Sequence, residues 1–86
     1  DIDIDLVDAH MKFIRKQYKA SSNLYVEALN KMKAIYRIDH PRFVRARDEL
    51  IQMHETWKQN KPNDTVDIRQ ILGRVIFPYE QKLTAP

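Results

Sequence analysis

Hydrophobic residues recur at alternating steps of three and four along four stretches of the chain. Such spacing places the members of each stripe on one face of a helix. Four amphipathic helices of this length bury their stripes against one another, so the pattern predicts an all-α, four-helix up-and-down bundle. The stripes are Ile4, Val7, Met11, Ile14 and Tyr18; Tyr25, Ala28 or Leu29, Met32, and Ile35 or Tyr36; Phe43, Ala46, Leu50, Met53 and Trp57; and Ile68, Leu72, Val75, Tyr79 and Leu83.

Residues that favour turns and caps place the boundaries of the first two helices. The first is expected from about Asp3 to Ala20, because Ser21-Ser22-Asn23 prefer caps and turns to helix interiors. The second helix then extends to about Arg37. A connection this short predicts that the two helices form an antiparallel hairpin.

The third helix has the clearest start signal, Asp39-His40-Pro41. Asp39 or His40 is expected to cap it, Pro41 suits the first helical position, and the helix extends to about Gln59. The polar residues 60–64 then form a loop, and Asp64 or Thr65 caps the fourth helix. Gly73 weakens that helix, and Pro78 is expected to kink or break it near residues 74–77.

Composition indicates one small helical domain. The 86 residues include no cysteine, which excludes disulfides and thiolate metal sites and fits an intracellular protein. A single glycine excludes a glycine-rich phosphate loop, and the sequence shows neither a signal peptide nor a membrane-spanning run. Because the first residue is Asp1, we expect residues 1–86 to be one domain of a longer protein.

No residue pattern predicts catalysis. His10, His40 and His54 include no pair four residues apart, so they do not predict a helical metal site. The carboxylates fall on polar helix faces, where solvation explains them. We therefore expect a non-enzymatic protein with no metal, no cofactor and no small-molecule substrate.

The charge pattern leaves nucleic-acid binding open as an alternative. Net charge is +3 with a pI near 9.3, and Arg42, Arg45 and Arg47 crowd the start of the third helix. A helix that opens with arginines after a short turn is compatible with DNA or RNA recognition. The net charge is small for such a protein, and basic residues late in the first helix also complement its macrodipole.

The first two helices carry more apolar residues than one seam requires. Leu6 and Phe13 flank the first stripe, while Leu24, Val26 and Leu29 widen the second. A helical hairpin that is apolar on more than one side favours a groove for the amphipathic helix of a partner. The other interpretation is that the fourth helix fills this groove.

The first sixty or so residues resemble the paired amphipathic helix domain of the Sin-type transcriptional corepressors. The resemblance rests on Val7, Met11, Ile14 and Tyr18, on Tyr25, Leu29 and Met32, and on Asp39-His-Pro41-Arg-Phe43-Val44-Arg45. The linker before Asp39 is shorter than the family's, and the family's His-Pro-Asp-Leu segment is absent. Residues 24–40 are also similar to half of a tetratricopeptide-type hairpin.

The corepressor resemblance implies a nuclear protein that binds one helix of a transcription factor between its first two helices. Its lysines and arginines are expected to favour an acidic partner. By position, the contact residues are Val7, Met11, Ile14, Leu24, Tyr25, Ala28 and Met32.

Overall fold

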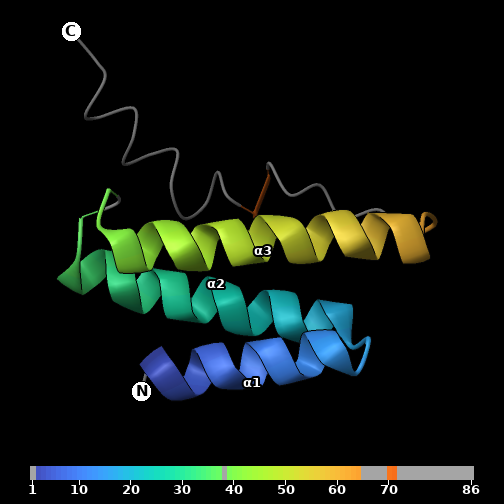
Figure 1. Cartoon of the computed structure of the whole chain (residues 1–86), viewed down its shortest axis with the longest axis horizontal. Helices are drawn as coiled ribbons and strands as arrows, with labels where there is room; N and C mark the ends of the chain where they lie inside the picture. The colour runs from blue at the N-terminus through green and yellow to red at the C-terminus, as the bar shows by residue number, and fades with distance from the viewer. Residues whose placement is uncertain (1, 38, 65–69, 72–86) are drawn as a thin grey trace, which may run out of the picture.

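The computed structural model describes residues 2–37, 39–64 and 70–71. In this part of the chain it contains the helices α1 (Ile2–Ile14), α2 (Tyr18–Ile35) and α3 (Pro41–Asn60), and no strand. The helix α2 lies between α1 and α3, and consecutive helices run in opposite directions (Figure 1). The predicted all-α class is thus confirmed, with three helices described rather than four. Apart from helical Gln70 and Ile71, the predicted fourth helix with Gly73 and Pro78 lies outside the described residues.

The third predicted stripe forms the centre of the core. All five of its members on α3 are buried, and they pack with Tyr25, Leu29 and Met32 of α2. At the end of α3, the indole of Trp57 stacks on Tyr18 with ring centroids 5.9 Å apart. This seam joins α2 to α3 as the unbroken 3-4-3-4 spacing predicts.

The helix α1 is turned differently from the prediction. Four members of its predicted stripe are exposed: Ile4 by 59%, Val7 by 62%, Met11 by 41% and Ile14 by 60%. The side of α1 that packs on the core instead carries a second apolar series in 4-3-4 spacing, Ile2, Leu6, Ala9 and Phe13.

The choice between these two series follows from the size of Ala9. Its side chain is fully buried, and its carbonyl oxygen accepts a 2.7 Å hydrogen bond from the Ser21 hydroxyl of α2. A methyl group and a serine permit this close approach, which the bulkier Ile4, Val7, Met11 and Ile14 do not. We call these four exposed residues the α1 outer face.

The first helix also ends earlier than predicted, at Ile14 rather than Ala20. Its end is a Schellman motif, in which Gln17 N–H donates to the Lys12 carbonyl at 2.8 Å and Lys16 N–H to the Phe13 carbonyl at 2.9 Å. Lys16 adopts the left-handed conformation with φ of 62°. Glycine or asparagine usually marks this position, so a lysine there gives no stop signal in the sequence.

Replacing Lys16 with glycine is expected to stabilise the protein by about 0.5–1 kcal/mol, because glycine avoids the cost of about 1–2 kcal/mol of placing an L-residue in the left-handed region. The greater entropy of glycine in the unfolded chain offsets part of this gain. Urea denaturation of Lys16→Gly beside Lys19→Gly, a change within helical α2, measures the effect. A Lys16→Gly protein less stable than the unaltered chain contradicts the assigned turn.

The predicted turn at Ser21 and Ser22 is wrong, because both serines lie inside α2 and are buried. Each has a partner on another helix: Ser21 bonds to Ala9, and the Ser22 hydroxyl lies 2.9 Å from Nε2 of His54 on α3. Serine avoids helix interiors when its hydroxyl competes for the local backbone. Here the neighbouring helices satisfy the hydroxyls instead.

The start of α3 agrees with the prediction. Nδ1 of His40 accepts a 3.1 Å hydrogen bond from the backbone N–H of Arg42, and Pro41 occupies the first turn. The helix ends at Asn60, one residue beyond the predicted Gln59. As far as the chain is described, none of the helices has the length and apolar character needed to cross a membrane.

Candidate binding groove between α1 and α3

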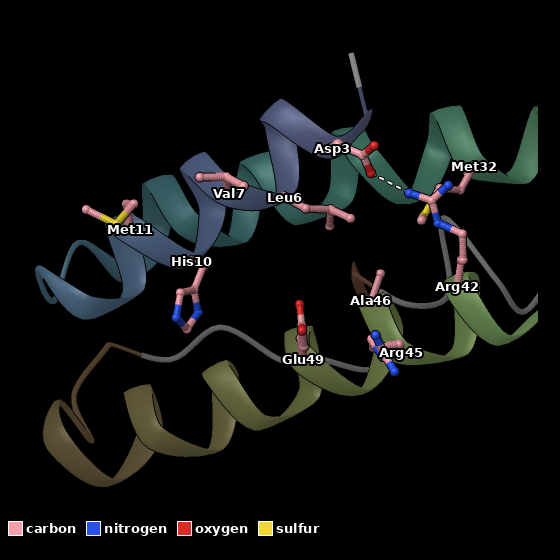
Figure 2. A pocket seen from close by; sticks show the side chains of 10 residues that line it. All are labelled: Asp3, Leu6, Val7, His10, Met11, Met32, Arg42, Arg45, Ala46 and Glu49. Atoms are coloured by element: carbon pink, nitrogen blue, oxygen red, sulfur yellow. Dashed lines mark hydrogen bonds and ion pairs between the residues drawn. The ribbon is translucent and has the colours of Figure 1, made fainter.

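A groove of about 420 Å³ lies between α1 and α3, with Met32 of α2 at its floor (Figure 2). Because both outer helices are antiparallel to α2, they run parallel to each other. Asp3 therefore lies opposite Arg42, and His10 opposite Glu49 seven residues further along both helices. We call this site the α1–α3 groove; its lining residues are Asp3, Leu6, Val7, His10, Met11, Met32, Arg42, Arg45, Ala46 and Glu49.

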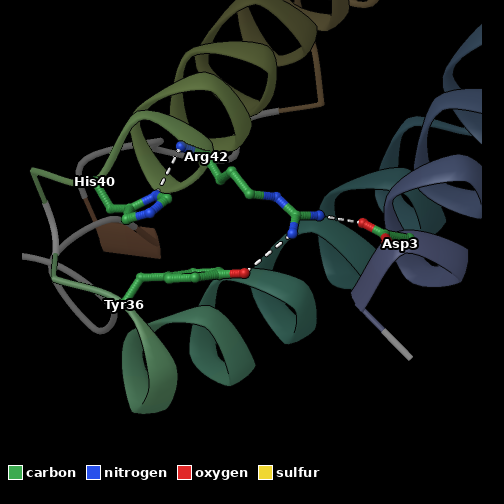
Figure 3. A network of polar contacts seen from close by, with 4 residues as sticks. All are labelled: Asp3, Tyr36, His40 and Arg42. Carbon is green, nitrogen blue, oxygen red and sulfur yellow. Dashed lines mark hydrogen bonds and ion pairs between the residues drawn. The ribbon is translucent and has the colours of Figure 1, made fainter.

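The side chain of Arg42 spans one end of the groove (Figure 3). Its guanidinium forms an ion pair with Asp3 of α1 and donates a 3.0 Å hydrogen bond to the hydroxyl of Tyr36. The Tyr36 ring also stacks on His40, with centroids 4.2 Å apart. These contacts are exposed, so they add little stability, and they link the starts of α1 and α3 to the residue that ends α2.

The other charged residues of the α3 wall, Arg45 and Glu49, are exposed and one helical turn apart. Neither forms an ion pair with the other or with any other described residue. A basic residue four positions before an acidic one is the weaker order for pairing within a helix. The groove wall thus presents one positive and one negative group to solvent.

Of the apolar residues predicted to bind a partner, Val7, Met11 and Met32 line the α1–α3 groove. The two on α1 are exposed, whereas Met32 is buried at the floor. Ile14 continues the exposed series of the α1 outer face beyond the groove lining. Val7, Met11 and Ile14 therefore share one face of α1, and Met32 is buried beneath the groove.

The remaining predicted contact residues lie elsewhere. Tyr25 and Ala28 are buried in the core, and Leu24 is partly buried against it. The structure therefore corrects the predicted groove between the first two helices: α1 and α2 pack directly together, and the groove lies between α1 and α3.

The residues of the nucleic-acid alternative divide between two environments. Arg42 and Arg45 line the same groove as the apolar residues, whereas Arg47 lies outside the groove lining and pairs with Asp48 at 3.1 Å. Two sets of residues that the sequence suggests for different functions thus meet in one place.

Sequence reasoning missed the remaining lining residues as members of a site. These are Asp3, Leu6, His10, Ala46 and Glu49. A signal for three of them is the seven-residue spacing of Asp3 and His10 on α1, which matches the spacing of the predicted Arg42 and Glu49 on α3. That signal is informative only once α1 and α3 are known to be parallel neighbours.

Two groups on α1 and α2 have shifted pKa values. The pKa of Tyr25 is raised to about 12, chiefly by burial and also by the negative charge of Glu49. On the other side of α1, the hydrogen bond from Lys31 lowers the pKa of the Asp5 carboxyl. Both shifts keep the two groups in their ordinary neutral-pH forms.

Comparison of the chain with protein-family models, curated protein sequences and solved structures found no match. The resemblance to the paired amphipathic helix domain therefore stays a prediction.

Proposed function

We propose that this chain is a non-enzymatic interaction module that binds an amphipathic helix of a partner protein in the α1–α3 groove. The supporting observation is the α1 outer face. Of the five large hydrophobic side chains exposed in the described residues, four lie on this face of α1, and two of them line the groove. A contiguous exposed apolar patch beside a groove is typical of an interaction site.

Binding would result from burial of the exposed α1 side chains against the apolar face of the partner. Full burial of one such side chain contributes about 1.5–3 kcal/mol, against the cost of lost translational freedom. Val7 and Met11 are the central contacts in this arrangement, because they belong to both the outer face and the groove.

The corepressor resemblance suggests which partner such a groove serves. If it holds, the partner is a helical segment of a transcription factor, and the protein acts in the nucleus in transcriptional regulation. The contact surface proposed here differs from the one implied by the resemblance, because it uses α1 and α3 rather than α1 and α2.

The nucleic-acid alternative has less support from the groove. Asp3 pairs with Arg42, and Glu49 lies one turn from Arg45, so carboxylates accompany both arginines where phosphates would bind. A DNA-binding groove would lose affinity steeply with added salt, and Arg42→Ala with Arg45→Ala would weaken it. Salt-titrated binding of duplex DNA therefore provides the competing measurement.

Replacing Met11 with glutamate is expected to weaken binding of an amphipathic helical peptide by at least about 30-fold, because it places a charge in the apolar contact. Met11 is already exposed by 41%, so the substitution leaves the fold intact. Isothermal titration calorimetry measures the affinity, and amide chemical shifts map the contact.

The matched control is Ile35→Glu, since Ile35 is exposed by 66% and lies outside the groove. It should leave peptide affinity unchanged. Equal loss in both variants, or peptide-induced shifts that avoid α1 and α3, would contradict the proposed site.

A further inference from the structure

We infer that the bound helix runs antiparallel to α3 and carries a basic residue facing Glu49, followed four residues later by an acidic residue facing Arg45. This inference rests on the proposed function and specifies the partner and its direction. It follows from the arrangement of helices around the α1–α3 groove and from the charges on its α3 wall.

The direction follows from the parallel arrangement of α1 and α3. Their macrodipoles point the same way, and α2, which packs between them, points the opposite way. A partner helix in the groove would contact α1 and α3, as α2 does. It would lie across the groove from Met32 of α2. A partner helix antiparallel to α1 and α3 would complete a four-helix arrangement in which neighbouring helices alternate in direction, as in up-and-down bundles.

The charge order follows from Arg45 and Glu49. Both side chains line the groove, and neither is paired with a described residue. Residues four apart on a helix lie about 5–6 Å from each other, so a partner pair with the same spacing meets both groups. An antiparallel helix reaches Glu49 first and Arg45 second, which requires a basic residue before an acidic one.

Arg42, at the end of the groove near Asp3, does not compete with Arg45 for the acidic residue of the partner. The ion pair of Arg42 with Asp3, together with its bond to Tyr36, already engages the arginine at that end. Of the two groove arginines, Arg45 is thus the one whose charge is available to a partner. Opposite charges placed in the reverse order on an antiparallel partner would meet two repulsions, which favours one sequence pattern over the other.

Two designed helical peptides of equal composition test the charge order. Both carry the same leucine stripe, and they differ in having Lys-x3-Glu or Glu-x3-Lys beside it. The Lys-x3-Glu peptide is expected to bind the full chain about tenfold more tightly in calorimetry. The double variant Arg45→Glu/Glu49→Arg should reverse that preference, whereas the matched swap Arg47→Asp/Asp48→Arg outside the groove should retain it.

A spin label on the N-terminus of the Lys-x3-Glu peptide tests the direction. It should broaden amide signals near His10 and Glu49 more strongly than those near Asp3 and Arg42. The reverse pattern of broadening overturns the inferred direction. Equal affinity of the two peptides overturns the inferred charge pair while the proposed function stands, and failure of both peptides to bind overturns both.

Two further measurements distinguish other occupants of the groove. If the chain sediments as a dimer that Val7→Glu disperses, the occupant is a second copy, and the inference is overturned. If groove amides shift when Leu72 and Val75 are both replaced by aspartate, the occupant is the C-terminal segment of the same chain, with the same consequence. If the chain is a monomer and the amide shifts of the groove residues are unchanged in the double aspartate variant, the result supports an external partner.

Discussion

Replacing Trp57 with alanine is expected to lower the free energy of unfolding by about 3–5 kcal/mol. The indole is only 5% exposed and stacks on Tyr18 at 5.9 Å. Its Nε1–H donates a 3.1 Å hydrogen bond to the carboxylate of Asp64. Alanine removes the stacking, the burial and this bond at the point where α2 and the end of α3 meet.

Chemical denaturation of Trp57→Ala, followed by circular dichroism, measures this loss. Ile35→Ala is the matched control, because it also deletes a large apolar side chain but from a site exposed by 66%. The control should change stability by less than about 0.5 kcal/mol. A loss below 1 kcal/mol for Trp57→Ala would show that the α2–α3 seam is not packed as described.

Replacing His54 with alanine is expected to cost about 2–3 kcal/mol, because it leaves a cavity and deprives the buried Ser22 hydroxyl of its partner. His54 is 5% exposed, and its ring lies 5.2 Å from that of Trp57. Burial lowers the pKa of this imidazole below its ordinary value of 6.5. The structure therefore holds His54 in its neutral form.

The lowered pKa makes stability depend on pH. At pH values between the folded pKa and 6.5, the unfolded chain binds a proton at His54 that the folded chain does not. Stability is therefore greatest above the unfolded value and falls as the pH drops through 6.5 toward the folded pKa. Urea midpoints measured from about pH 7.5 to about pH 5 should show this decline.

Two variants distinguish His54 from the other titrating groups. His54→Gln removes the ionisable ring and should flatten much of the decline. His10→Gln, at an exposed position on α1, should retain it. A decline that persists unchanged in His54→Gln would contradict the buried neutral histidine.

The sequence predicts much of this fold because α3 has only one apolar face that can be buried. Its apolar residues, from Phe43 to Trp57, form one unbroken series, and His40 with Pro41 marks its start. Only one face of such a helix can be buried. The helical period therefore determines both the element and its orientation.

The helix α1 has two apolar series that could face the core, so helical spacing alone did not predict its orientation. The series through Val7 and Met11 and the series through Leu6 and Ala9 both have helical spacing. The series through Val7 and Met11 has larger apolar side chains, so the sequence pattern favours it as the buried one. The contact of Ala9 with Ser21, however, requires small side chains and depends on the position of another helix.

The end of α1 and the position of the groove were missed for related reasons. Lys16 adopts a conformation usually marked by glycine, and Ser21 and Ser22 resemble a turn until their partners on α1 and α3 are known. The sequence indicated more apolar residues on α1 than one seam requires, but Leu6 and Phe13, named there as the surplus, pack on the core, and the stripe through Val7 and Met11 is the exposed one. The second wall of the groove depends on the parallel packing of α1 and α3, which helical spacing does not encode.

Thiol labelling of single cysteines on α1 tests most directly whether the α1 outer face is available to a partner. The chain contains no cysteine, so each replacement reports on one position. In the full chain without a ligand, Val7→Cys and Met11→Cys should react readily with a thiol reagent, whereas Ala9→Cys should be strongly protected. Protection of Val7→Cys and Met11→Cys together with a reactive Ala9→Cys would contradict the orientation of α1, and protection of all three would show that the proposed binding face is covered.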